Sequence, residues 1–285
     1  MIAIIMIISI IAQVSQQVCR KEFNKISEDI PFGFSLAGVL ATLIYFLITA
    51  KGNVNVSPKI FSYVIPFSIC YTTAYVCTIF AIKHGPLSLT SLIISCSVAV
   101  PLIYGVVVLR EPLNMALILG IVFLFSSIIL VSKPWEKGNS SITPKWIMYI
   151  SLTFLSNGIC MTTQKLFQIK DKGFHSNEFM IFSLVIVFFI ILIFVLTSER
   201  KKFKDIITNG HILWPALCGT SNGIANQLTM ILAVSIPASF LYPVQSAGAI
   251  ILTAFVSILV YKEKLSNLQK VGFLFGIFAI IIFNI

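Results

Sequence analysis

The chain has 285 residues, of which 58% are hydrophobic and only 11% are charged. In a soluble domain about a quarter of the residues are charged, so this composition excludes an ordinary soluble protein. The formal net charge of +10 could suggest nucleic-acid binding, but the Lys and Arg residues lie mainly between apolar segments, as in the loops of a membrane protein, and we expect no nucleic-acid partner.

Apolar stretches of about 20 residues recur along the whole chain, and each could cross the hydrocarbon core of a bilayer as a helix. A helix satisfies its own backbone hydrogen bonds in lipid, and the alternating strands of a membrane barrel are absent. The sequence therefore predicts an all-α polytopic membrane protein in contact with lipid. The ten predicted transmembrane helices are 1–19, 32–50, 61–82, 87–109, 113–132, 146–168, 179–198, 212–235, 238–260 and 268–285.

The two halves of the chain repeat. A shift of 152 residues aligns AIKHGPLSLTSLIISCSVAVPLIYGVVVLREPLNMALILG (81–120) with AVSIPASFLYPVQSAGAIILTAFVSILVYKEKLSNLQKVG (233–272) without a gap, and a shift of 148 pairs Gln16 with Gln164. We predict a first five-helix repeat over 1–132, a linker loop over 133–145 and a second five-helix repeat over 146–285. Because each repeat has an odd number of helices, the second would be inverted in the membrane, an arrangement typical of secondary transporters.

A short signature closes the aligned region in both halves. It reads LREPL at 109–113 followed by Gly120, and YKEKL at 261–265 followed by Gly272. This pattern resembles the drug/metabolite transporter superfamily, and more narrowly its EamA-type ten-helix members. The resemblance implies a central cavity walled mainly by predicted helices 1, 3, 4, 6, 8 and 9, with helices 2, 5, 7 and 10 at the periphery. It carries almost no information on the substrate.

Glu111 and Glu263 occupy the same place in the two copies of the signature, at short turns between predicted helices. We interpret both as structural residues that cap a helix or pair with a loop cation, rather than as substrate ligands.

Side-chain amides are unevenly distributed among the predicted helices. Away from the ends, Asn and Gln occur in helices 1, 6, 8 and 9 and are absent from helices 2, 5, 7 and 10. An amide that faced lipid would lack hydrogen-bond partners, so these residues should face protein or water. Bonding between helices is the alternative role for each amide, but the set favours a polar cavity. The candidate substrate-binding residues are Gln13, Gln16, Tyr71, Tyr75, Asn157, Gln164, Lys165, Asn222, Asn226, Tyr242 and Gln245.

Charged residues are absent from the middle of the predicted helices. No Asp or Glu lies there, although proton-coupled transporters usually keep a titratable carboxylate within the membrane. Lys165, near the end of predicted helix 6, is expected to reach the interface with its long side chain. We therefore expect transport that does not require a proton gradient.

The predicted function is that of a secondary transporter or facilitator for a small polar metabolite, such as an amino acid or a nucleoside, working by alternating access as a monomer in the plasma membrane. The alternative is a non-transporting membrane protein, either an assembly partner or an intramembrane enzyme. An enzyme would need a catalytic set within the membrane, which the sequence does not offer, so we expect no enzymatic activity.

The cysteines and histidines do not form a metal-binding pattern. The six cysteines form no C-x-x-C pair and no His lies at ligand spacing, so we expect no metal, no cofactor and no disulfide. Orientation stays open, because the loop charges favour termini outside the cell whereas the resemblance implies cytoplasmic termini.

Overall fold

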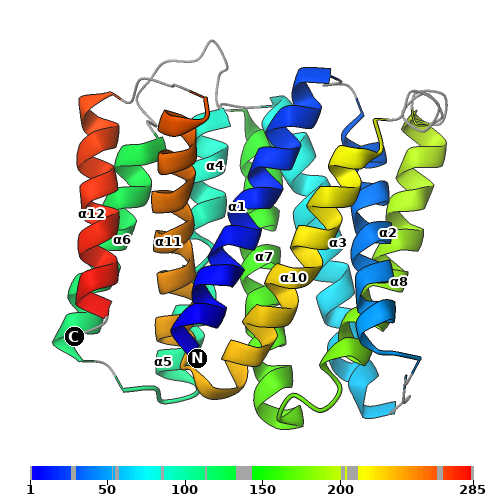
Figure 1. Ribbon diagram of the computed structural model, residues 1–285, viewed down its shortest axis with the longest axis horizontal. Coiled ribbons are helices and arrows are strands. Elements are labelled where there is room, and N and C mark those ends of the chain that lie inside the picture. The colour runs from blue at the N-terminus through cyan, green and yellow to red at the C-terminus, as the bar shows by residue number, and fades with distance from the viewer. Residues whose placement is uncertain are drawn as a thin grey trace. The chain divides into compact units, whose positions relative to one another are not determined.

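A computed structural model of the chain describes residues 2–26, 30–52, 54, 58–84, 87–112, 114–132, 143–199, 203, 211–261 and 266–283. Over these residues the fold is helical and contains no strand (Figure 1). The α-helices are α1 (Ile2–Ile26), α2 (Pro31–Thr49), α3 (Phe61–His84), α4 (Leu87–Cys96), α5 (Ala99–Val107), α6 (Met115–Ser132), α7 (Pro144–Asp171), α8 (Ser176–Phe194), α10 (Leu213–Ser235), α11 (Ala238–Leu259) and α12 (Asn267–Phe283). A 3-10 turn, η1 (Pro58–Ile60), precedes α3, and a π-helical turn, η2 (Val195–Glu199), follows α8.

Several of these helices suit a membrane by length and composition. In the described part of the chain, the segments long and apolar enough to cross a bilayer are Ile2–Phe23, Pro31–Thr49, Pro58–Ala81 and Ser176–Glu199. Shorter apolar helices cover Ile93–Val107, Met115–Leu130 and Ala238–Thr253. Apolar helices of this length indicate a multi-pass membrane protein.

The chain forms two compact units, and each combines segments from both halves of the sequence. The first unit holds Met1–Thr72 and Leu166–Val234, and so contains α1, α2, α8, α10 and parts of α3 and α7. The second unit holds Thr73–Lys165 and Ser235–Ile285, and so contains α4, α5, α6, α11, α12 and the remaining parts of α3 and α7.

In the first unit, α2 packs against both α8 and α10. The rings of Phe32 on α2 and Phe194 on α8 stack with centroids 5.3 Å apart. On the other side, a Cβ atom at Gly219 of α10 would lie only 2.1 Å from the carbonyl oxygen of Gly38. The two backbones can approach this closely only because residue 219 has no side chain. Thr42 Oγ1 then donates to the carbonyl oxygen of Gly219 at 2.8 Å.

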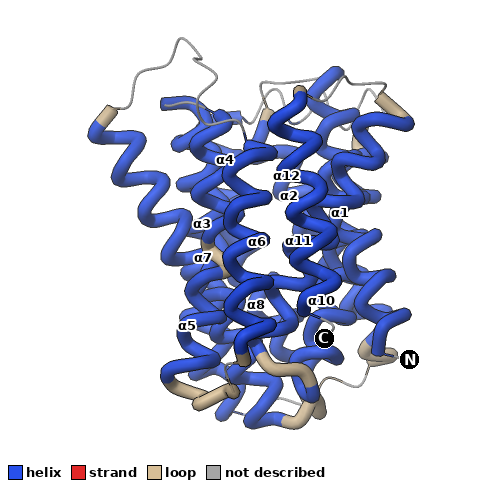
Figure 2. Tube along the Cα trace, turned by 90° about the vertical axis from the view of Figure 1, so that its left-hand side faces the viewer, coloured by secondary structure: helices blue, strands red, loops and turns tan. Residues whose placement is uncertain are grey.

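In the second unit, α6 and α12 run side by side (Figures 1 and 2). The ring of Phe123 meets that of Phe275 edge-on, with centroids 5.4 Å apart. Four of the helices that lack interior amides, α2, α6, α8 and α12, thus pack in pairs, one pair in each unit. The contacts named here between the members of each pair are aromatic.

The predicted helix 87–109 was expected to be continuous, but the structure divides it into α4 and α5. The reason is Pro101, which has no N–H to donate to the carbonyl oxygen of Ser97. That carbonyl accepts from the N–H of Val100 instead, at 3.1 Å, and Ser97 N–H donates to Ile94 at 3.1 Å. Two tight turns thus replace the regular helical bonds and break the helix at Ser97 and Val98.

The ends of α5 and α11 carry a structural trace of the sequence repeat. The N–H groups of Val108 and Leu109 both donate to the carbonyl oxygen of Tyr104, at 2.9 and 3.2 Å. The residues aligned with them by the shift of 152, Val260 and Tyr261, both donate to Val256, at 2.9 and 3.4 Å. The aligned sequences therefore end their helices in the same way.

Candidate functional site

In the first unit, the amides of α1 and α10 form a short hydrogen-bonded chain. Asn222 Nδ2 donates to Gln16 Oε1 at 2.9 Å, and Asn226 Nδ2 donates to Asn222 Oδ1 at 2.8 Å. The sulfur of Cys218 contacts the carbonyl oxygen of Gln16 at 3.8 Å. We call this α1–α10 contact the amide seam. Its amides are half-buried and satisfy one another, so they can hold the two helices together and still offer remaining donors and acceptors to a solute.

The amide seam continues toward the start of α1 with hydroxyl groups. Ser9 Oγ lies 3.3 Å from Thr229 Oγ1, and Gln13 Nε2 donates to Ser9 Oγ at 3.5 Å. Ser9 and Thr229 are buried, whereas Gln13 is half-buried. The two predicted residues of α1, Gln13 and Gln16, therefore belong to the same contact.

A further polar contact of α10 was not predicted. The hydroxyl group of Tyr45 on α2 hydrogen-bonds to Gln227 Oε1, and the Tyr45 ring fills the space beside Gly223, where a Cβ atom would lie 2.5 Å from it. The resemblance to EamA-type transporters implied that predicted helix 2, which also lacks amides, lies at the periphery. The available signal was a tyrosine well inside an apolar stretch, since a buried hydroxyl group needs a partner.

In the second unit, the predicted residues of α7 and α11 are buried together. Gln164, Lys165, Tyr242 and Gln245 are each about 5% exposed or less. The Tyr242 hydroxyl group donates to the carbonyl oxygen of Met161 on α7 at 2.7 Å, and Lys165 Nζ donates to the carbonyl oxygen of Ile236 just before α11. We call this group the α7–α11 cluster.

The expectation that Lys165 reaches the interface is wrong. Its side chain is only 4% exposed, because it lies within α7 rather than at its end at Asp171 and bonds a carbonyl group instead of extending outward.

Glu111 caps the first turn of α11 from the connection between α5 and α6. Its Oε1 accepts from Ala238 N–H at 2.7 Å and its Oε2 accepts from Ser239 N–H at 2.8 Å. A carboxylate at this position satisfies backbone donors that have no partner within the helix. Its negative charge also interacts favourably with the positive end of the helix dipole. Its aligned residue, Glu263, lies outside the described residues.

The remaining predicted residues are Asn157, Tyr71 and Tyr75. Asn157 Nδ2 donates to Ser97 Oγ at 2.7 Å, directly at the break between α4 and α5. Tyr71, in the first unit, stacks on Phe67 with ring centroids 5.7 Å apart. Tyr75 belongs to the second unit and is half-buried.

The comparisons with known proteins decide the family. The EamA-like transporter family matches residues 1–133 and 144–285, which together span almost the whole chain. The chain belongs to the EamA-like transporter family. It is therefore a membrane transporter of the drug/metabolite transporter superfamily.

Solved structures share the fold of this EamA-like transporter. One of them, titled "Crystal structure of protein", is 10% identical to it and covers 99% of this chain and 95% of its own, with a TM-score of 0.79. At this identity the likeness shows the fold alone. No match is found among the curated proteins.

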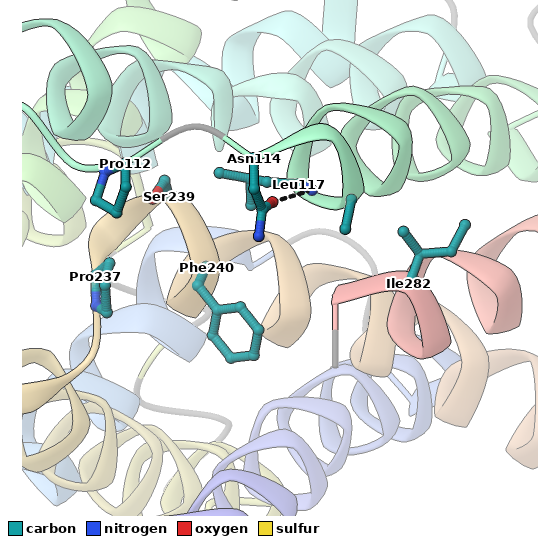
Figure 3. Close-up of a pocket in the computed structure, with 8 residues that line it drawn as sticks. Pro112, Asn114, Leu117, Pro237, Ser239, Phe240 and Ile282 are labelled. Atoms are coloured by element: carbon teal, nitrogen blue, oxygen red, sulfur yellow. Dashed lines mark hydrogen bonds between the residues drawn. The ribbon is translucent and has the colours of Figure 1, made fainter. Parts of the chain in front are cut away.

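A small pocket of this EamA-like transporter lies in the second unit. It has a volume of about 110 Å³ and is lined by Pro112, Asn114, Ala116, Leu117, Pro237, Ser239, Phe240 and Ile282 (Figure 3). The side chain of Asn114 turns back to accept from Leu117 N–H at 2.7 Å and so caps α6 (Figure 3). The pocket lies beside the Glu111 cap and contains none of the predicted substrate ligands.

Family membership also bears on the chemistry that the described residues offer. EamA-like proteins are transporters rather than enzymes. Among the described residues no group of three or more His, Cys, Asp or Glu side chains is placed to hold a metal ion. What the amide seam and the α7–α11 cluster present is neutral amides, hydroxyl groups and one buried ammonium group, which can hydrogen-bond a polar solute without reacting with it.

Proposed function

We propose that this EamA-like transporter moves a small polar metabolite, such as an amino acid or a nucleoside, across the plasma membrane by alternating access, acting as a monomer with ten transmembrane helices in two inverted five-helix repeats. The substrate ligands are drawn from the amide seam, from the α7–α11 cluster, and from Tyr71, Tyr75 and Asn157.

The observation that supports this proposal best is that the polar side chains hydrogen-bond across particular pairs of helices. Asn222, Asn226 and Gln16 bond one another between α1 and α10, and Tyr242 bonds α7 from α11. Helices α2, α6, α8 and α12, which carry no amide in their interiors, instead pack through aromatic side chains. Amides and hydroxyl groups suit the mixed donors and acceptors of a zwitterion or a nucleoside.

Bonding between helices is the competing role for the same amides, and such bonds contribute about 0.6 kcal/mol each on average. The two roles differ in whether water reaches the side chains during the transport cycle. A residue that lines a substrate path becomes accessible in at least one conformation, whereas a residue that only joins helices stays protected.

Thiol labelling separates the two roles. In a variant without the six native cysteines, Cys is placed singly at Gln16, Gln164, Asn222 and Asn226. Leu184 and Phe275, on helices without interior amides, are the matched controls. We expect a membrane-impermeant thiol reagent to label the four amide positions and to spare the two controls, since Leu184 is buried between helices and Phe275 packs on Phe123. Equal protection at all of these positions would contradict the proposal and leave only the role of joining helices.

A further inference from the structure

The turn between α10 and α11 is held by two oppositely charged side chains from elsewhere in the second unit. Lys165 on α7 donates to the carbonyl oxygen of Ile236, and Glu111 accepts from the N–H groups of Ala238 and Ser239. Lys165 therefore satisfies a carbonyl acceptor of the turn, and Glu111 satisfies two of its N–H donors. We call this arrangement the Glu111–Lys165 clasp.

The local backbone is built to bring the Glu111 carboxylate to this place. Arg110 has a φ of 55°, in the left-handed region that a non-glycine residue rarely adopts, and this folds the chain back so that Glu111 N–H donates to the carbonyl oxygen of Gly105 at 3.0 Å. A Cβ atom at residue 105 would lie 2.4 Å from Glu111 Oε2. The left-handed backbone of Arg110 and the missing side chain of Gly105 thus both help to place the Glu111 carboxylate.

The two residues of the clasp hold the same short segment, 236–239. Lys165 is buried and donates to the carbonyl oxygen of Ile236, while Glu111 accepts from the N–H groups of Ala238 and Ser239. Loss of either bond leaves a polar group of this turn without its partner, which is costly. Because both bonds fix the same four residues, the Glu111 cap and the Lys165 bond should form and break together rather than independently.

The clasp determines where candidate substrate ligands lie. Tyr242 and Gln245 are on the first turns of α11, directly after the residues that Glu111 caps. Tyr242 also donates to Met161, one turn before Lys165 on α7, so α7 and α11 are joined at two levels. If the first turn of α11 moved away from α7, the α7–α11 cluster would open.

The other repeat does not supply the same set of groups. The alignment places Pro86 and Leu87 opposite Ala238 and Ser239, and it places Gln17 opposite Lys165. Proline has no N–H to donate and glutamine carries no charge. A counterpart of the clasp built around Glu263 would therefore lack the ammonium group and one of the two amide donors.

We propose that the Glu111–Lys165 clasp is a gate of the transporter that holds the first turn of α11 to α7 and opens during the transport cycle. The gate is one-sided, because the equivalent positions of the other repeat lack the same groups. In this proposal Glu111 is a positioning residue that acts through α11 and Lys165. The gate rests on the proposed alternating-access function, but the contacts that make it can be tested without any substrate.

Hydrogen–deuterium exchange of the purified full chain in lipid nanodiscs tests the gate. Loss of a hydrogen bond to a charged group should accelerate exchange by about tenfold or more. We expect Glu111→Gln and Lys165→Met each to accelerate exchange in residues 236–247, and the double variant to exchange no faster than the faster single variant, because the two residues act together. Lys165→Arg, which keeps the charge and a donor, should retain the protection of the parent.

Glu199→Gln is the matched control. Glu199 caps the start of α2 in the first unit with the same geometry, accepting from Phe32 N–H at 3.2 Å and from Gly33 N–H at 2.7 Å. We expect it to accelerate exchange only in α2 and to leave residues 236–247 unchanged.

Four results would overturn the gate. Unchanged exchange in residues 236–247 of Glu111→Gln would show that the cap restrains nothing, and multiplied effects in the double variant would show two independent residues. Acceleration that extends equally to the α6–α12 pair would mean a general loss of folding. If Glu111→Gln does not fold, equal exchange in Lys165→Met and Lys165→Arg would by itself refute the clasp. None of these readouts depends on whether the chain transports a given solute.

Discussion

Gly219 is the residue at which the backbone of α10 meets that of α2. A Cβ atom there would lie 2.1 Å from the carbonyl oxygen of Gly38, and the same contact holds the hydrogen bond from Thr42. We expect Gly219→Ala to lower the free energy of unfolding by about 1–3 kcal/mol, because the helices must separate to admit the methyl group.

Gly38→Ala provides the control for this prediction. On the opposite side of the same contact, a Cβ atom at Gly38 would meet only the carbonyl oxygen of Pro215, at an ordinary 3.6 Å. We expect this variant to unfold at nearly the same temperature as the parent in detergent. Equal melting temperatures for the two variants would show that the close approach at Gly219 does not restrict the packing of α2 and α10.

At the scale of single residues, the sequence predicted which side chains are polar and interior but not which partner each one has. Gln16 and Asn222 were expected to face protein or water, yet nothing in the sequence paired them, because the pairing depends on how far α1 is shifted along α10. Tyr45 was missed for the same reason, since its bond to Gln227 depends on the close approach that Gly219 and Gly223 permit. The burial of Lys165 was misjudged because its partner, the carbonyl group of Ile236, is distant in sequence.

At the scale of helices, the amide seam makes a prediction about how strongly α1 and α10 are held together. Asn222 Nδ2 bonds Gln16 Oε1 at 2.9 Å between the two helices. In a double-mutant cycle of Gln16→Leu and Asn222→Leu, measured by unfolding in detergent, we expect a coupling energy of about 0.6 kcal/mol and at most about 1.7 kcal/mol, the range for such bonds in membranes. A coupling energy within about 0.3 kcal/mol of zero would show that the two amides act independently.

The helices themselves were predicted well where apolar runs are uninterrupted and less well where a proline intervenes. The break between α4 and α5 follows from Pro101, which the sequence displayed, but a proline can also bend a helix without ending it. What decides the outcome here is that the Ser97 carbonyl oxygen has a new partner in Val100 and that Ser97 Oγ accepts from Asn157. These are contacts of the folded chain, and the second of them comes from a helix some sixty residues away.

At the scale of the whole molecule, the repeat and its signature were enough to predict the EamA-like family, which the comparison shows. The division into compact units could not be predicted in this way, since each unit combines helices from both halves of the sequence. Internal similarity reports which segments share an ancestor or a pattern, whereas packing depends on which apolar faces meet. The α6–α12 pair illustrates the difference, because its helices come from different repeats and still pack through Phe123 and Phe275.

Coupling to a proton gradient is a property of the whole transporter, and Lys165→Gln tests it. In the parent, Lys165 is buried and bonds the carbonyl oxygen of Ile236, and no Asp or Glu lies in the middle of a predicted helix to carry a proton. We therefore expect proteoliposomes of the parent, given radiolabelled amino acids or nucleosides and an imposed pH gradient, to equilibrate the solute without concentrating it. Glutamine at position 165 can still donate to the carbonyl group of Ile236 but carries no charge, so counterflow exchange should remain substantial in the variant. Accumulation that follows the gradient in the parent and disappears in Lys165→Gln would contradict uncoupled transport and identify Lys165 as the residue through which the proton acts.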